Sequence, residues 1–248
     1  MNSNSDMPFV DHLEEFRKRL IIVLVAHVIV TLLAFSQSGA ILKLLMELNP
    51  QMHLIFIEPS EIMIVYVEIA LVMAVTLCSP LTIYHIWAFV AAGLFPNEKR
   101  LIKVALALGF VFFVLGVVFA YKIVVPMSLK FFTRIAIDEI SAMISVKSYI
   151  SFILSMLLAM GIVFNIPSFV YVATKLGVIT PDTLKEYSKY LIVLIFIIAA
   201  VVTPPDVVSQ MMMAIPMVAL LQLSIFISKK VYVEKPGDRE EKTVEEKN

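Results

Sequence analysis

The sequence has little of what soluble enzymes use for chemistry. It contains one cysteine, seven glycines and four histidines in 248 residues. A single cysteine, Cys78, excludes an intramolecular disulfide and a multi-cysteine metal site. The sequence has no phosphate loop, no Gly-x-Ser-x-Gly motif and no His-Glu-x-x-His zinc motif. It therefore predicts a protein that is not an enzyme and that has no metal or cofactor of its own.

Charge is also scarce, since 16% of residues are charged, 60% are hydrophobic and the mean hydropathy is +0.93. A helix rises about 1.5 Å per residue, so about 20 apolar residues cross a bilayer core of about 30 Å. Six segments carry no formal charge over 16 to 29 residues each. The sequence therefore predicts an all-α integral membrane protein with six transmembrane helices. The six segments are 20–42, 69–97, 104–121, 148–174, 190–205 and 207–228.

The positions of the basic residues predict the orientation of the chain. With six spans and a cytoplasmic N-terminus, 15 lysines and arginines fall inside and five outside. This bias places both termini in the cytoplasm. No cleavable signal peptide is expected, because the opening residues are polar. We expect residues 1–19 to form a cytoplasmic amphipathic segment, residues 20–230 the membrane domain, and residues 231–248 a disordered cytoplasmic tail.

Prolines and polar residues predict where helices bend, begin and end. Pro80 is expected to kink the second span, and the third helix is expected to end near Pro126. The fourth span contains Asn165-Ile166-Pro167, which predicts a polar amide and a kink deep in the membrane. Thr180-Pro181-Asp182 is typical of a helix cap and first turn.

The last two spans are expected to be short. The fifth has a strongly apolar part of only about 13 residues, 190–202, and the external turn at 203–206 is very small. Such spans indicate a locally thin membrane or a helical hairpin that leans on its neighbours.

Three polar segments remain, and each has a plain structural interpretation. Residues 14–19 hold charges four positions apart on one helix face, as in a solvated cluster that sets topology. Glu98 suits the start of a helix, and Asp206 suits the cap of the sixth helix.

Taken together, these segments resemble the TatC family, the multi-spanning component of the twin-arginine protein translocase. The resemblance covers residues 8–230, and its motifs occur in the same order on a six-span background. The matching motifs are His12-Leu13-Glu14-Glu15-Phe16-Arg17-Lys18-Arg19-Leu20, Ser79-Pro80 with Tyr84 and Trp87-Ala88-Phe89, Glu98-Lys99-Arg100, Phe119-Ala120-Tyr121, and Thr203-Pro204-Pro205-Asp206 with Ser209-Gln210 and Ala214-Ile215-Pro216.

The resemblance implies the function and the partners. The TatC family binds signal peptides that carry two adjacent arginines and passes folded cargo proteins across the cytoplasmic (inner) membrane. It works with TatA-type and TatB-type single-span subunits, self-associates in a larger complex and draws on the proton-motive force. The resemblance implies no nucleic acid partner.

The resemblance also implies site residues. Arginine pairs bidentately with carboxylates, whereas lysine is a compact point charge, so a receptor for two arginines needs carboxylates at the membrane surface. The positions that match the family's signal-peptide-binding residues are Glu15 and Glu98, with Arg17 and Phe89 beside them. Structural or coupling candidates are Asn165, Asp206, Gln210 and Pro80.

The chain departs from the family pattern at three positions. Asn165 stands where the family commonly has a glutamate, and it cannot titrate, although it can form hydrogen bonds or hold water. Glu68 stands where a basic or neutral residue is common, and a proline usual in the first external segment is replaced around Leu44.

An alternative function is a small-solute secondary transporter whose midplane site contains Asn165 and His85. The absence of sequence repeats and of carboxylates at the midplane argues against this alternative.

Overall fold

The structure is a computed structural model that describes residues 9–48, 54–91, 99–135 and 144–232. It is almost entirely helical, and five of its helical segments are long and apolar enough to cross a membrane. The prediction of an all-α membrane protein is confirmed. The candidate spans are Leu13–Phe35, Glu61–Phe89, Lys103–Thr133, Val146–Lys175 and Val207–Val231.

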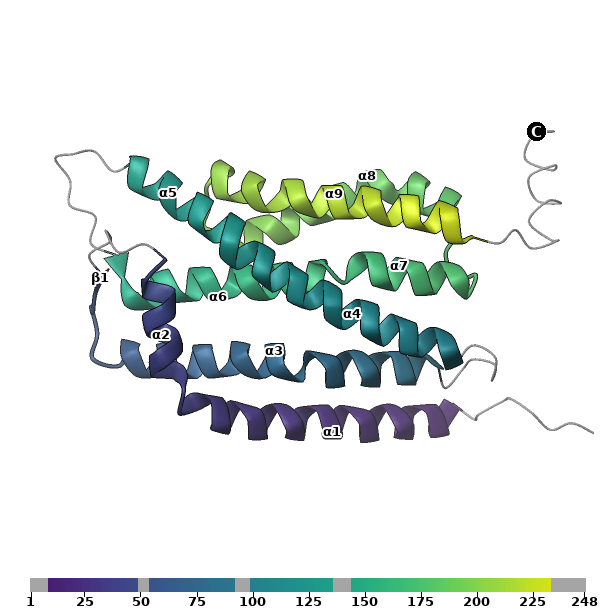
Figure 1. The fold of residues 1–248 in the computed structure, drawn as a ribbon, viewed down its shortest axis with the longest axis horizontal. Coiled ribbons are helices and arrows are strands. Elements are labelled where there is room, and N and C mark those ends of the chain that lie inside the picture. The colour runs from purple at the N-terminus through teal and green to yellow at the C-terminus, as the bar shows by residue number, and fades with distance from the viewer. Residues whose placement is uncertain (1–8, 49–53, 92–98, 136–143, 233–248) are drawn as a thin grey trace, which may run out of the picture.

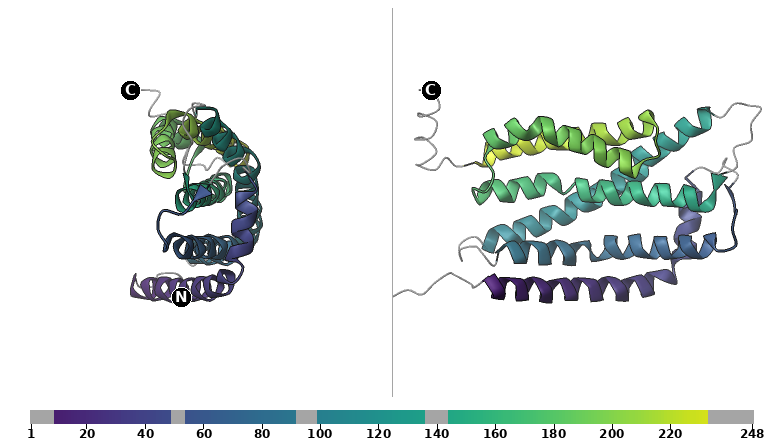
Figure 2. Two further views of the ribbon diagram at one scale, coloured as in Figure 1. Left: turned by 90° about the vertical axis from the view of Figure 1, so that its left-hand side faces the viewer. Right: turned by 180° about the vertical axis from the view of Figure 1, so that it is seen from behind.

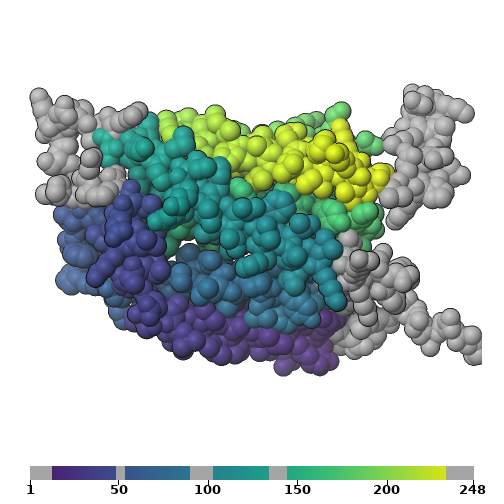
Figure 3. Space-filling view, in the orientation of Figure 1, coloured from purple at the N-terminus to yellow at the C-terminus, as the bar shows by residue number. Residues whose placement is uncertain are grey.

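The first two long helices lie side by side. Helix α1 (Phe9–Phe35) packs mainly on α3 (Glu61–Ala91), and only 6% of the α1 span is buried within the protein. Figure 3 shows α1 along one edge of the molecule, next to α3. Helix α3 continues through Pro80, and the kink expected there stays a prediction.

The third span differs from the prediction. Helix α4 (Lys99–Phe119) passes through a π-helical turn, η2 (Ala120–Val124), into α5 (Val125–Ile135). The expected end near Pro126 is therefore wrong. Proline lacks an N–H and disrupts a helix at interior positions, whereas the first turn tolerates it. Pro126 is the second residue of α5, and the π-helical turn before it absorbs the irregularity.

The fourth span is interrupted as expected. Two residues separate helix α6 (Val146–Val163) from helix α7 (Ile166–Lys175). Pro167 lies in the first turn of α7. Asn165 stands at the N-cap of α7, but its side chain makes no capping hydrogen bond. It donates instead from Nδ2 to the Gly161 carbonyl oxygen at 2.8 Å.

Helices α8 (Pro181–Val202) and α9 (Val207–Val231) form a hairpin. They contain 22 and 25 residues, fewer than the 29 to 31 of the three central candidate spans. Four charged residues in the first half of α8 leave a short apolar part, and α8 is not among the five candidate spans. The Thr180 side chain caps α8 as predicted, accepting a hydrogen bond from the Thr183 N–H at 3.2 Å.

A short helix and two short strands cover the end of the bundle opposite the start of α1. Helix α2 (Ser38–Met46) runs across that end (Figure 1). Strands β1 (Leu54–Ile55) and β2 (Ile144–Ser145) pair in parallel and join two connecting segments that lie far apart in the sequence. No pattern in the sequence indicates this pairing.

Viewed along the helices, the bundle is a curved layer rather than a closed barrel. Figure 2 shows α1 at one end of the curve and the α8–α9 hairpin at the other. Helices α6 and α7 lie centrally and pack against α4, and α7 also packs against α9. The main core is apolar and draws on both halves of the chain.

The α4–α6 crossing depends on glycine. A Cβ atom at Gly116 would lie 2.5 Å from the Met160 carbonyl oxygen and 2.8 Å from Cβ of Phe164. At Gly39, a Cβ atom would meet only the Tyr66 side chain, at 3.4 Å from Oη and 3.8 Å from Cζ, which are ordinary contact distances.

We expect Gly116→Ala to lower the stability of the purified protein by about 1 to 3 kcal/mol, because the added methyl group forces α4 away from α6. Thermal unfolding in detergent measures this effect. Gly39→Ala is the matched control and should leave the melting temperature unchanged or slightly raised, since alanine favours helix. Equal melting temperatures for the two variants would contradict the close crossing.

Candidate functional site

The first turns of α1 carry two ion pairs of different character. Lys18 Nζ lies 2.9 Å from Glu14 Oε1, and both side chains are more than half exposed. Glu15 and Arg19 also pair, but their side chains are only 26% and 23% exposed. A fully solvated ion pair contributes little to stability, whereas a half-buried ion pair holds its geometry better. The inner pair is therefore the one that can shape a site.

Only one oxygen of the Glu15 carboxylate is occupied by Arg19. Arg19 donates to Glu15 Oε1 from Nε at 3.1 Å and also from its terminal Nη2. Glu15 Oε2 is buried and accepts no hydrogen bond from any residue that the structure describes. A buried acceptor without a donor is costly, and it marks a place where a ligand can bind.

The end of α3 supplies the other wall of the site. The rings of Phe16 and Phe89 lie 5.3 Å apart at 58°. A cavity of about 370 Å³ lies between α1 and α3 beside this ring pair. Its lining is apolar except for Arg19, Thr82 and His85, and His85 Nδ1 is a second buried atom with no partner among the described residues. The remaining lining residues are Phe16, Leu20, Val23, Ile86 and Phe89.

This arrangement is better suited to binding a planar cation than to nucleophilic catalysis or to metal binding. A guanidinium group can donate to the free carboxylate oxygen while its face stacks on an aromatic ring. Among the described residues, no three histidine, cysteine, aspartate or glutamate side chains gather to hold a metal ion.

Two of the four residues expected to bind a signal peptide meet in this site. Phe89 lines the cavity, and Glu15 is tied to its edge by the ion pair with Arg19, which also lines it. Arg17 is exposed on α1, and Glu98 lies outside the described residues.

Three further residues, Phe16, Arg19 and His85, belong to the site but were not predicted to bind the peptide. The spacing of Glu15 and Arg19 indicates their pairing, because residues four apart share a helix face.

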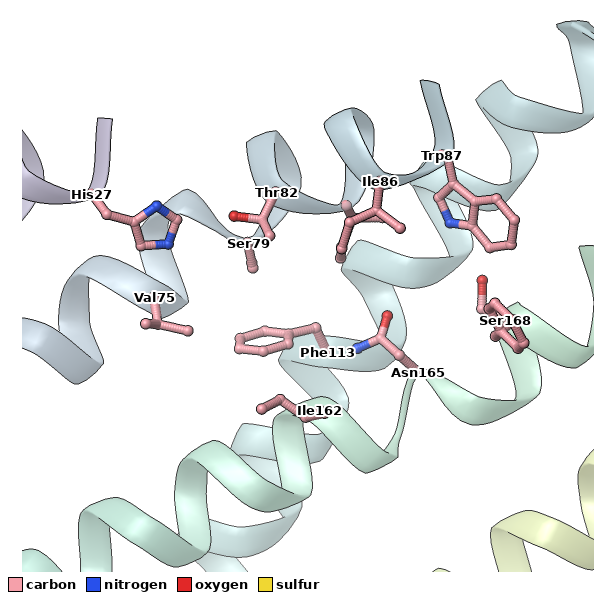
Figure 4. Close-up of a pocket in the computed structure, with 12 residues that line it drawn as sticks. His27, Val75, Ser79, Thr82, Ile86, Trp87, Phe113, Ile162, Asn165 and Ser168 are labelled. Carbon is pink, nitrogen blue, oxygen red and sulfur yellow. The ribbon is translucent and has the colours of Figure 1, made fainter. Parts of the chain in front are cut away.

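The alternative transporter site is not formed. His85 lines the cavity between α1 and α3, whereas Asn165 lines an adjoining cavity that shares only Thr82 and Ile86 with it (Figure 4). The two side chains do not share an enclosed midplane cavity, so the geometry does not favour a solute-binding role for this pair.

The remaining candidate residues lie away from this site. Asp206 caps α9, with Oδ1 accepting from the Ser209 N–H at 2.7 Å and Oδ2 accepting from the Ser209 hydroxyl. Gln210 donates from Nε2 to the Phe196 carbonyl oxygen at 3.0 Å and so ties α9 to α8. The capping role predicted for Asp206 is therefore present in the structure.

The fold and the site define a class: a helical membrane protein that spans the bilayer several times and presents a half-buried carboxylate, flanked by aromatic rings, at one end of the bundle. Residues 11–216 match the sequence model of one family, described as "Sec-independent protein translocase protein (TatC)". The chain belongs to the TatC family. Members of this family are protein translocase subunits, and this confirms the prediction that the chain is not an enzyme.

Individual relatives and solved structures agree with this assignment. The chain is 38% identical over 229 residues to the TatC protein of Aquifex aeolicus, covering 90% of this chain and 95% of the relative. It is 29% identical to the Escherichia coli TatC protein over 246 residues, covering 97% and 95%. A solved structure described as "Crystal Structure of Twin Arginine Translocase Receptor- TatC" superposes with a TM-score of 0.82 at 37% identity. That match covers 89% of this chain and 99% of the solved chain.

Removal of the α9 cap gives a direct test of the role of Asp206. We expect Asp206→Ala to destabilise the protein by about 0.5 to 2 kcal/mol, because the Ser209 N–H loses its acceptor. Asp206→Asn retains a side-chain oxygen and should keep most of the stability. Thermal unfolding of the two purified variants separates these outcomes, and equal losses would rule out capping as the main contribution.

Proposed function

We propose that this protein is the signal-peptide receptor and core subunit of a twin-arginine translocase, which supports export of folded proteins. The observation that carries the proposal is the Glu15 carboxylate, with one oxygen held by Arg19 and the other buried and without a partner among the described residues. Its partner Arg19 and the Phe16–Phe89 ring pair line one cavity in a chain of the TatC family.

Arginine fits this carboxylate better than lysine does. The guanidinium plane offers five donors in a fixed fork and stacks on rings, whereas an ammonium group is compact and strongly hydrated. At a half-buried site the ammonium group would lose its hydration without matching this geometry. Partial burial of Glu15 also strengthens its attraction for a cation relative to water.

A second arginine requires a second carboxylate, and we assign that role to Glu98. Glu98 directly precedes α4 in the sequence, and α4 begins at the same end of the bundle as α1 (Figure 1). The two carboxylates, one on α1 and one directly before α4 in the sequence, would then each bind one of the two adjacent arginines. Arg17, exposed on α1 two residues after Glu15, would shape the surface over which the signal peptide approaches.

The charge distribution supports a position in the cytoplasmic membrane with both termini in the cytoplasm. Fifteen basic residues then lie inside and five outside, in accord with the positive-inside tendency. The recognition site would face the cytoplasm, where the signal peptide begins its passage. We propose that the proton-motive force supplies the energy for export.

The α8–α9 hairpin offers a binding surface for TatA-type and TatB-type single-span partners. An apolar groove of about 380 Å³ lies between α9 and the η2–α5 segment. Its lining includes three methionines, and methionine adapts readily to different packing partners. The lining residues are Phe119, Ile123, Val124, Met127, Val207, Val208, Met211, Met212, Ile215 and Pro216.

Glu15→Ala and Glu98→Ala should each abolish export of twin-arginine substrates without loss of the protein from the membrane. Loss of one charge-assisted hydrogen bond should weaken binding of the signal peptide by about ten- to a hundredfold. Export of a folded reporter and peptide binding to the purified protein measure the two effects.

Glu14→Ala is the matched control for Glu15→Ala, because the Glu14 carboxylate forms an exposed ion pair on the same helical turn. This variant should retain export and binding. Normal export by both the Glu15 and Glu98 variants would overturn the assignment of the recognition site.

A further inference from the structure

The Glu15 carboxylate already holds a guanidinium group, and that group belongs to the chain itself. Arg19 donates to Glu15 Oε1 from both Nε and Nη2, with Nε at 3.1 Å. The arginine of a signal peptide would use the same kind of charge-assisted hydrogen bond. Arg19 therefore occupies the carboxylate in the way that the ligand would.

Two guanidinium groups cannot both bind this carboxylate in the strongest geometry. The strongest pairing consists of two parallel hydrogen bonds, one to each carboxylate oxygen. Arg19 holds Oε1 of Glu15, and Oε2 is buried, so a second guanidinium group has to move a neighbouring side chain before it can reach both. Two like charges beside one half-buried carboxylate also repel each other. An incoming arginine therefore competes with Arg19 for Glu15.

The cavity beside the ion pair offers Arg19 a second position. Arg19 and His85 both line this cavity, and His85 Nδ1 is buried without a partner among the described residues. A neutral imidazole with its hydrogen on Nε2 presents Nδ1 as an acceptor, and a guanidinium group is a donor only. Thr82 also lines the cavity, and its hydroxyl oxygen can accept a hydrogen bond while it donates to the Cys78 carbonyl oxygen.

We propose that Arg19 is an internal competitor of the signal-peptide arginine, and that His85 accepts Arg19 when the peptide displaces it from Glu15. This inference rests on the proposed function of the protein as a signal-peptide receptor. Arg19 keeps Glu15 paired while no peptide is bound, and His85 lowers the cost of releasing Arg19. The affinity for the peptide is then the difference between two arginine pairs, and the unpartnered nitrogen of His85 has a role.

Binding of a labelled twin-arginine signal peptide to the purified full-length protein tests the competition. We expect Arg19→Gln to bind the peptide about two- to tenfold more tightly, because the peptide no longer displaces a cation from Glu15. Arg19→Lys retains the charge without the fork and should give an intermediate affinity. Lys18→Gln is the charge-matched control and should bind as the unmodified protein does, because Lys18 pairs with Glu14 at the exposed surface.

A double-mutant cycle tests the second position of Arg19. His85→Leu should weaken peptide binding about two- to tenfold when Arg19 is present, because the displaced side chain then lacks its acceptor. His85→Gln retains an acceptor and should keep most of the affinity. In the Arg19→Gln background, His85→Leu should have little effect, whereas a packing role for His85 would give the same loss in both backgrounds.

Weaker or unchanged peptide binding by Arg19→Gln, or an equal loss from His85→Leu in both backgrounds, would overturn the proposal. Thermal unfolding shows whether each variant is folded, and Arg19→Lys supplies the comparison if the neutral variant does not fold. A twin-lysine peptide separates this result from a failure of the proposed function. The unmodified protein should prefer the twin-arginine peptide, and absence of that preference would overturn the recognition site itself.

Discussion

The contact between α1 and α3 is the interaction on which the recognition site depends. Helix α1 is attached to the rest of the bundle mainly through α3, and nearly all of its remaining surface faces outward. This contact brings Phe16 against Phe89 and closes the cavity that Glu15 adjoins. Without it, the Glu15–Arg19 pair would be an ordinary surface pair on a solvated helix turn, with little preference for any cation.

Inside the bundle, polar groups are satisfied locally, and this leaves a few atoms available for partners. Serine and threonine hydroxyls donate to carbonyl oxygens of their own or neighbouring helices, as apolar surroundings require. Among the described residues, the buried side-chain atoms left without a partner are Glu15 Oε2 and His85 Nδ1.

The elements that could be predicted from sequence are those with local causes. Charge-free runs indicate spans, the Asn165-Ile166-Pro167 sequence indicates a break, and Asp206 indicates a cap. The helix end predicted near Pro126 is wrong, because the π-helical turn that accommodates this proline leaves no local signature. Within the site, the spacing of Glu15 and Arg19 predicts their pairing. The meeting of Phe16 with Phe89 and the position of His85 depend on how α1 packs against α3, which no local pattern encodes.

The most direct test of the central claim is photo-cross-linking from a reactive residue at Leu20, which lines the cavity beside Glu15 without forming part of the ion pair. The protein in membranes is offered a twin-arginine signal peptide and its twin-lysine variant. The account predicts adducts with the arginine peptide and few or none with the lysine peptide, because only guanidinium matches the free carboxylate oxygen and the rings. Equal labelling by both peptides, or labelling by neither, would contradict it.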